Sequence, residues 1–148
     1  MSIFFLTGCA TERYHKGSDV EGTGVQVFRR PLNGPVVFSF GEEEDGVSLK
    51  GIVLRGAQDQ PVSASRNGRV VFVNDRLRGY GRILIIEHDS VFSTVYAGCS
   101  ELLVSEGQWV RQGQPVARVG NAGKGGVPRL YFEVRKNARP EDPLLYLT

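Results

Sequence analysis

After residue 31 the chain alternates short apolar runs with turn residues. The runs are rich in Val, Ile, Phe and Tyr, as strands are, and no segment keeps an apolar stripe at helical spacing over three turns. Asn67-Gly68 and Gly79-Tyr80-Gly81 lie between runs and are typical of tight turns. The pattern predicts an all-β domain, built as an antiparallel sandwich or barrel. The expected strands are 36–40, 49–54, 69–73, 82–88, 91–97, 102–104, 116–119 and 130–135.

The last of these runs shows the alternation of a strand with two unlike faces. Phe132 and Val134 alternate with Glu133 and Arg135. Successive side chains of a strand point to opposite faces of its sheet. We therefore expect Phe132 and Val134 to face the core, and Glu133 and Arg135 to face solvent.

The sequence predicts one domain preceded by a short arm. A chain of 148 residues is long enough to bury a substantial core and too short for two typical domains. Residues 10–30 are polar, contain glycine and show weak periodicity, so we expect a polar arm or tether there. Residues 31–148 form the expected domain.

The first ten residues suggest a membrane anchor. Leu6-Thr7-Gly8-Cys9 resembles a bacterial lipobox. Residues 1–9 would then consist of part of a lipoprotein signal peptide and the lipobox, and Cys9 would carry the lipid. Ala10 fits sorting to the outer membrane, so the expected location is the periplasm, with membrane contact through the lipid anchor only. The apolar run is short and no Lys or Arg precedes it, so an ordinary buried N-terminal segment is the alternative.

The charge pattern argues against a nucleic-acid partner. The formal net charge is +2, and the Lys and Arg residues are scattered along the chain. A phosphate-binding face requires clustered positive charge. Nor does any apolar run approach the roughly 18 residues of a membrane-spanning helix.

Ordered short motifs with compatible spacing extend from residue 34 to residue 147. They include Pro61-Val62-Ser63-Ala64, Asn67-Gly68-Arg69-Val70-Val71, Val95-Tyr96-Ala97, Glu106-Gly107-Gln108-Trp109-Val110, Gly113-Gln114-Pro115-Val116-Ala117 and Leu130-Tyr131-Phe132-Glu133-Val134-Arg135. This series resembles the LytM family, the lysostaphin-like murein endopeptidases and their relatives. The resemblance implies a LytM-type antiparallel fold, similar to a duplicated hybrid motif.

The same resemblance implies that the zinc site of the family is lost. Active members bind zinc through a His, an Asp four residues later and the second His of a His-x-His pair, positions that here hold Leu49, Val53 and Tyr131. The two catalytic His positions hold Gly98 and Arg129. Leu and Val offer a metal no donor atom. We therefore expect no catalysis, no zinc and no other cofactor.

The remaining reactive residue types receive structural interpretations. The chain has only two histidines, His15 in the arm and His88 at a strand end. No acid–base partner accompanies His88 in the pattern, so we expect local hydrogen bonds to satisfy it. Cys99 is expected to be a small buried residue and not a nucleophile. Residues 42–45 form an acidic run, which predicts a solvated loop or, as an alternative, a loop that docks a partner.

Degenerate relatives of the NlpD and EnvC type activate periplasmic amidases that cleave peptidoglycan during cell division. The resemblance thus implies a non-catalytic envelope lipoprotein that regulates an N-acetylmuramyl-L-alanine amidase. Its groove would bind the partner through Leu49, Val53, Gly98, Arg129 and Tyr131. Arg129 could pair with a carboxylate of the amidase or of a peptidoglycan stem peptide.

Other functions fit parts of the sequence. The chain could be a peptidoglycan-binding or envelope-complex scaffold without an activator role, or an endopeptidase with an improvised metal site. The replaced residues could also have drifted without a new use. The turns between Gly107 and Ala117 resemble those of biotinyl and lipoyl carriers, but Lys50, Lys124 and Lys136 lack the hairpin-tip context that carriers require.

Overall fold

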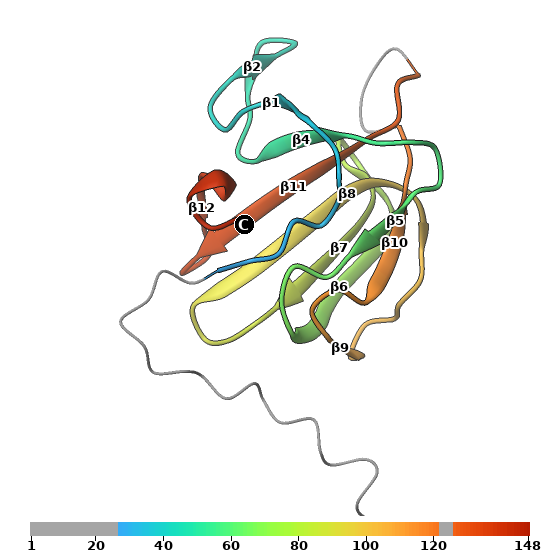
Figure 1. The fold of residues 1–148 in the computed structure, drawn as a ribbon, viewed down its shortest axis with the longest axis vertical. Coiled ribbons are helices and arrows are strands. Elements are labelled where there is room, and N and C mark those ends of the chain that lie inside the picture. The colour runs from blue at the N-terminus through green and yellow to red at the C-terminus, as the bar shows by residue number, and fades with distance from the viewer. Residues whose placement is uncertain (1–26, 122–125) are drawn as a thin grey trace, which may run out of the picture.

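The computed structural model describes residues 27–121 and 126–148, and every regular element there except one short 3-10 helix is a strand (Figure 1). This confirms the all-β expectation. No helix among the described residues is long and apolar enough to cross a membrane. The elements are β1 (Val36–Phe38), β2 (Glu43–Glu44), β3 (Val47–Ser48), β4 (Ile52–Arg55), β5 (Pro61–Ser63), β6 (Gly68–Leu77), β7 (Gly81–Glu87), β8 (Phe92–Leu102), β9 (Trp109–Val110), β10 (Pro115–Val119), β11 (Arg129–Lys136), β12 (Arg139–Glu141) and the 3-10 helix η1 (Pro143–Leu145).

One antiparallel sheet forms most of the domain. Its main path runs β1-β4-β11-β8-β7-β6-β9, and β12 pairs with the free part of β11. The strand β8 is 11 residues long, so it can pair with β7 and β11 and also, near its C-terminal end, with β10. Because β10 in turn pairs with β5, the sheet continues past β8 into a second region that packs over the core.

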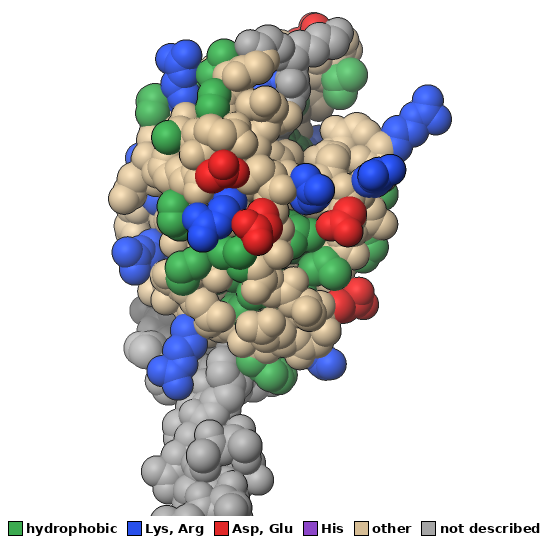
Figure 2. Space-filling model, turned by 90° about the vertical axis from the view of Figure 1, so that its right-hand side faces the viewer, with side chains coloured by type: hydrophobic (Ala, Val, Ile, Leu, Met, Phe, Trp, Pro, Cys, Tyr) green, Lys and Arg blue, Asp and Glu red, His purple; other side chains and the backbone are tan. Residues whose placement is uncertain are grey.

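The two faces of the sheet differ in how they are covered. On one face, a large core includes the fully buried Tyr96, Phe132 and Ile52. On the other face, a smaller cluster centres on Val95 and Ala97, and partly buried side chains pack around it. We call this second side the groove face, since the candidate site lies there. On the side of the molecule shown in Figure 2, basic and acidic side chains lie among one another.

Several predicted strands have other boundaries in the structure: the run 49–54 becomes a strand only at Ile52, and the run 36–40 ends at Phe38. The run 102–104 is not a strand of its own, because Leu102 ends β8 and the residues after it enter a connection. The backbone N–H of Leu103 still donates to the carbonyl of Val116, at 2.9 Å, and Val104 is buried. The run is apolar because it packs against the core, and the chain turns there.

The chain joins the domain earlier than residue 31. Phe28 is completely buried, and its ring makes edge contacts with Phe92 and Tyr146. Its N–H donates to the carbonyl of Tyr146 at 2.8 Å, and a bridge links it to Leu147. Residues 28–30 of the expected arm therefore pack on the domain, whereas residues 1–26, with Cys9, lie outside the described residues.

Glu133 does not face solvent, so that expectation was wrong. Its side chain is 1% exposed, and its carboxylate accepts hydrogen bonds from Arg135 Nε and from the Tyr131 hydroxyl, both at 2.6 Å. Gly51 lies directly over it, since a Cβ at Gly51 would come within 2.9 Å of Glu133 Cγ. Two charge-assisted hydrogen bonds make the burial of this carboxylate tolerable.

His88 follows β7 directly and is held by hydrogen bonds, as the sequence predicted. Its Nδ1 lies 2.8 Å from the carbonyl oxygen of Asn67, and its Nε2 lies 2.8 Å from the hydroxyl of Thr94. The ring also packs on the edge of Phe28. A carbonyl can only accept, so Nδ1 carries a proton and the neutral ring can accept at Nε2. Burial lowers the pKa of His88 to about 4.

Acidification is predicted to destabilise the domain through His88. The folded chain keeps this ring neutral down to about pH 4, whereas an unfolded chain protonates it near pH 6.5. The unfolded state binds more protons between these values, so stability falls as the pH falls from 6.5 to 4. We expect urea unfolding to give a free energy of unfolding about 2 kcal/mol lower at pH 5 than at pH 7 from this residue.

His88→Gln is the matched control, because Gln does not titrate. Its difference in unfolding free energy between pH 7 and pH 5 should be smaller by about the same 2 kcal/mol. Asp89 does not affect this comparison. Burial by itself would raise the pKa of its carboxyl, but backbone N–H donors hold that pKa below the usual range. An equal pH dependence in both proteins would contradict the assignment.

Candidate functional site: a groove in place of a metal centre

The floor of the groove is set by the register of three neighbouring strands. Tyr131 of β11 lies opposite Val53 of β4 on one side and Ala97 of β8 on the other. Side chains directly opposite one another in antiparallel strands lie about 5 Å apart at Cβ. Val53 and Tyr131, two positions to which the LytM resemblance assigns zinc ligands in active members, are therefore neighbours.

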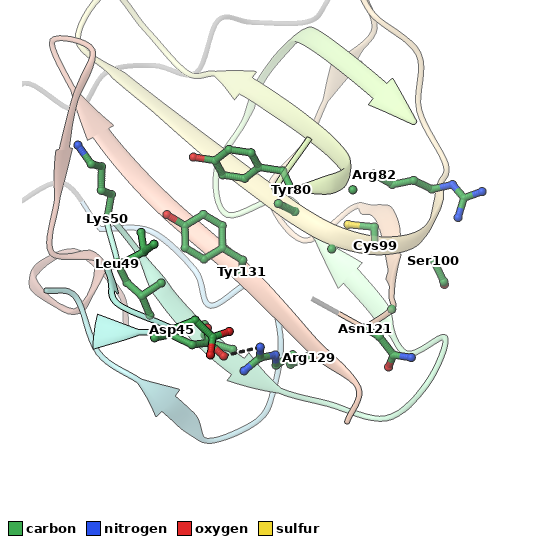
Figure 3. Close-up of a pocket in the computed structure, with 18 of the residues that line it drawn as sticks. Asp45, Leu49, Lys50, Tyr80, Arg82, Cys99, Ser100, Asn121, Arg129 and Tyr131 are labelled. Atoms are coloured by element: carbon green, nitrogen blue, oxygen red, sulfur yellow. Dashed lines mark hydrogen bonds and ion pairs between the residues drawn. The ribbon is translucent and has the colours of Figure 1, made fainter. Parts of the chain in front are cut away.

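All five positions singled out in the sequence line one cavity of about 1010 Å³. Leu49 comes from the segment before β4, and Gly98 from the middle of β8. Val53, Arg129 and Tyr131 come from β4 and β11. In Figure 3, Leu49 and Tyr131 lie next to one another, and Arg129 lies beside Asp45 of the hairpin region. The fold thus brings the five residues together.

One wall of the groove is a small hairpin, β2–β3, which forms a separate two-stranded sheet. The backbone of Gly41 and that of Leu49 close its base through a 2.8 Å hydrogen bond. At its centre, Glu44 Oε1 accepts from Arg129 Nη2 at 2.6 Å, and the two side chains are 25% and 9% exposed. The Arg129 guanidinium also stacks on the ring of Phe38. The acidic run is therefore partly solvated, but Glu44 is anchored to the sheet.

The opposite wall is the turn between β6 and β7. The rings of Tyr80 and Tyr131 lie 5.9 Å apart between centroids, and together they form an aromatic end to the cavity. The carbonyl of Tyr80 accepts from the N–H of Gly98 at 2.9 Å, which ties the turn to β8. Gly98 has a φ of 77°, in the left-handed region that favours glycine. A side chain at this position would carry backbone strain.

Two titratable groups of the cavity, Cys99 and Tyr131, are a poor nucleophile and a poor acid. Cys99 is 6% exposed, as the sequence predicted, and burial raises the pKa of its thiol to about 12. A protonated thiol does not attack a carbonyl carbon. Burial and the adjacent Glu133 carboxylate raise the pKa of the Tyr131 hydroxyl well above its usual range. Its proton therefore stays in the hydrogen bond to Glu133.

The donor set does not fit the zinc ion that active members hold. Leu49 and Val53 carry no lone pairs, and the residues that the structure describes contain no group of three or more His, Cys, Asp or Glu suited to a metal. The carboxylate that comes nearest to Arg129, that of Glu44, is already bound to its guanidinium. A fixed positive charge at this point also disfavours a cation.

Sequence reasoning missed several residues of the cavity. Lys50, Tyr80, Arg82 and Asn121 line it as well, and Figure 3 places Lys50 on the hairpin side and Arg82 on the opposite side. Among these four residues, only Tyr80 could have been found from the sequence, because its position between two glycines indicates an exposed turn. The others come from segments whose place in the groove depends on the tertiary fold.

Comparison with known sequences gives three informative relatives. The chain is 38% identical over 125 residues to the murein hydrolase activator NlpD of Escherichia coli, covering 84% of the chain and 32% of the relative. It is 39% identical over 128 residues to the lipoprotein NlpD/LppB homolog of Pseudomonas aeruginosa (86% and 42%), and 37% identical over 118 residues to the murein hydrolase activator EnvC of Escherichia coli (79% and 28%). The chain thus spans less than half the length of each relative.

Solved structures confirm the fold. The catalytic domain of lysostaphin from Staphylococcus simulans superposes with a TM-score of 0.68 at 24% identity, covering 76% of this chain and 90% of that one. A chain of the SpoIIQ–SpoIIIAH pore-forming complex gives a TM-score of 0.71 at 27% identity, covering 84% and 92%. The model of peptidase family M23 matches residues 47–143. The chain therefore belongs to peptidase family M23, as its LytM-like motifs predicted.

Proposed function

We propose that this M23 domain does not cleave peptidoglycan and instead binds an N-acetylmuramyl-L-alanine amidase through its groove and stimulates it. The observation that carries the proposal is that Leu49, Val53, Gly98, Arg129 and Tyr131 line a single cavity. Apolar and aromatic groups replace metal ligands there, and such a surface suits a partner's side chain. The activator names of two relatives support the same reading.

The proposal extends to the location of the whole protein. A lipid on Cys9 would anchor it to the outer membrane, with the domain in the periplasm near peptidoglycan during cell division. The name of the Pseudomonas aeruginosa relative, a lipoprotein, supports the anchor. Regulation of a hydrolase requires the domain to lie where the hydrolase meets its substrate.

A charge placed in the groove should weaken stimulation. Leu49→Glu puts a carboxylate among the apolar groups that face Tyr131, so a partner side chain would lose its contact. We expect about a tenfold loss of amidase-dependent dye release from labelled sacculi, which corresponds to the loss of one good anchor. The matched control is Leu145→Glu, since Leu145 is 66% exposed and lies outside the groove.

The same assay tests the proposal as a whole. The chain alone should release no dye, and the Leu145→Glu variant should stimulate as the unmodified chain does. Dye release by the chain without amidase would contradict the non-catalytic assignment. Equal stimulation by Leu49→Glu and the unmodified chain would contradict the role of the groove.

The Arg129–Glu44 pair is predicted to hold the hairpin that forms one wall. Arg129→Glu would place a second carboxylate next to that of Glu44, and the two would repel each other. We expect the free energy of unfolding to fall by about 2 kcal/mol, since a partly exposed pair contributes less than a fully buried one. Limited proteolysis should then cleave the hairpin between residues 41 and 49 faster than in the unmodified chain.

The charge-swapped double variant Glu44→Arg/Arg129→Glu is the control, because it restores opposite charges. It should recover part of the lost stability and of the resistance to proteolysis. Full recovery is not expected, since the stacking of Arg129 on Phe38 is also lost. A double variant no better than Arg129→Glu would show that the pair does not hold the hairpin.

A scaffold function without activation is the second candidate. The observation that favours it is the similarity to a chain of the SpoIIQ–SpoIIIAH pore-forming complex. In that case the groove would hold an envelope protein or peptidoglycan itself. Co-sedimentation with purified sacculi, without amidase, separates the two. Groove-dependent pelleting together with no stimulation would favour the scaffold.

A further inference from the structure

Strand register aligns five side chains in a row across the groove face, at the end away from the hairpin. One comes from each of β11, β8, β7, β6 and β9. In that order they are Arg135, Ser93, Glu87, Arg69 and Trp109. Their neighbours along these strands point into the core, so alternation places the whole row on the groove face.

The row ends in an exposed aromatic ring. Trp109 is 51% exposed, although tryptophan is buried to a large extent in most proteins. The guanidinium of Arg69 lies over its ring at 5.9 Å from the centroid, which orients the indole on the sheet. Val71, 36% exposed, follows Arg69 in a bulge of β6. An oriented, half-exposed indole is a feature of binding surfaces.

The charges of the row balance one another. Arg69 and Glu87 are cross-strand neighbours, and Arg135 is paired with Glu133 at 2.6 Å. A nucleic acid or an anionic membrane requires an excess of positive charge, which this row lacks. A binding site for a protein partner typically has a contiguous apolar patch of about several hundred Å². Here, charged side chains surround a single aromatic ring. The surface suits a neutral ligand rich in hydroxyl groups.

We propose that Trp109, Arg69 and Glu87 form a glycan-binding ledge that takes a neutral oligosaccharide. The apolar C–H face of a sugar packs on the indole, and its hydroxyl groups exchange hydrogen bonds with the guanidinium and the carboxylate. In the cell envelope the ligand is the uncharged N-acetylglucosamine part of the peptidoglycan glycan strand, an identification that rests on the proposed function.

The ledge is distinct from the groove. Trp109 lies four strands across the sheet from β11, about 19 Å, and its row lies four residues along β11 from Tyr131, about 13 Å. The domain can therefore hold a glycan at the ledge while the groove holds a protein partner. Such an arrangement would bring an amidase to its substrate.

The only tryptophan of the chain is Trp109, so intrinsic fluorescence reports on this site alone. Titration of the unmodified chain with chitotetraose, and with the longer chitohexaose, both uncharged, should shift the emission to shorter wavelength and protect the ring from acrylamide. Unchanged emission and quenching with both probes would overturn the proposal. No amidase is present, so failure here leaves amidase stimulation untouched.

Variants locate the binding. Trp109→Ala should reduce pelleting with insoluble chitin about tenfold, and Arg69→Gln should reduce it less. Leu103→Ala, another exposed apolar residue outside the row, should pellet as the unmodified chain does. Cooperative urea unfolding checks that each variant is folded. If Trp109→Ala pelleted normally but lost a protein partner, the surface would be a protein-docking site and the proposal would be wrong.

Discussion

The pairing of β11 between β4 and β8 is the constraint on which the groove depends. It places Tyr131 against Val53 on one side and Ala97 on the other. Because side chains alternate between the faces of a sheet, a slip of one residue would turn Tyr131 into the core and Leu130 into the groove. The fully buried Leu130 and Phe132 prevent this slip, since they have to stay in the core.

Two positive charges at the groove face, those of Arg129 and Arg135, are neutralised within the chain. Arg129 is bound by Glu44, and Arg135 by the buried Glu133. What remains at the floor is an aromatic and apolar surface, shaped by Tyr131 and its neighbours. A cavity lined by such groups has the chemistry of a binding site.

The accuracy of the sequence reasoning depended on how local each feature was. The strands β6, β7 and β11 followed from their β-branched runs, and Cys99 was predicted to be buried because no His or Lys lies near it in the pattern. The alternation rule failed at Glu133, because it assumes that one face of the strand is open, whereas Gly51 covers it. Strands of two or three residues, such as β9, have too few side chains to show any period.

By itself, the sequence determined the fold class and the family resemblance, and it singled out the five residues that line the groove. These follow from local turn and strand chemistry and from the order of the motifs. Only the tertiary structure decided that Glu44 anchors a hairpin through Arg129, and that Trp109 ends a row of charged side chains five strands wide. Such contacts join residues up to 85 positions apart, and their geometry depends on how strands pair in space, which no local pattern records.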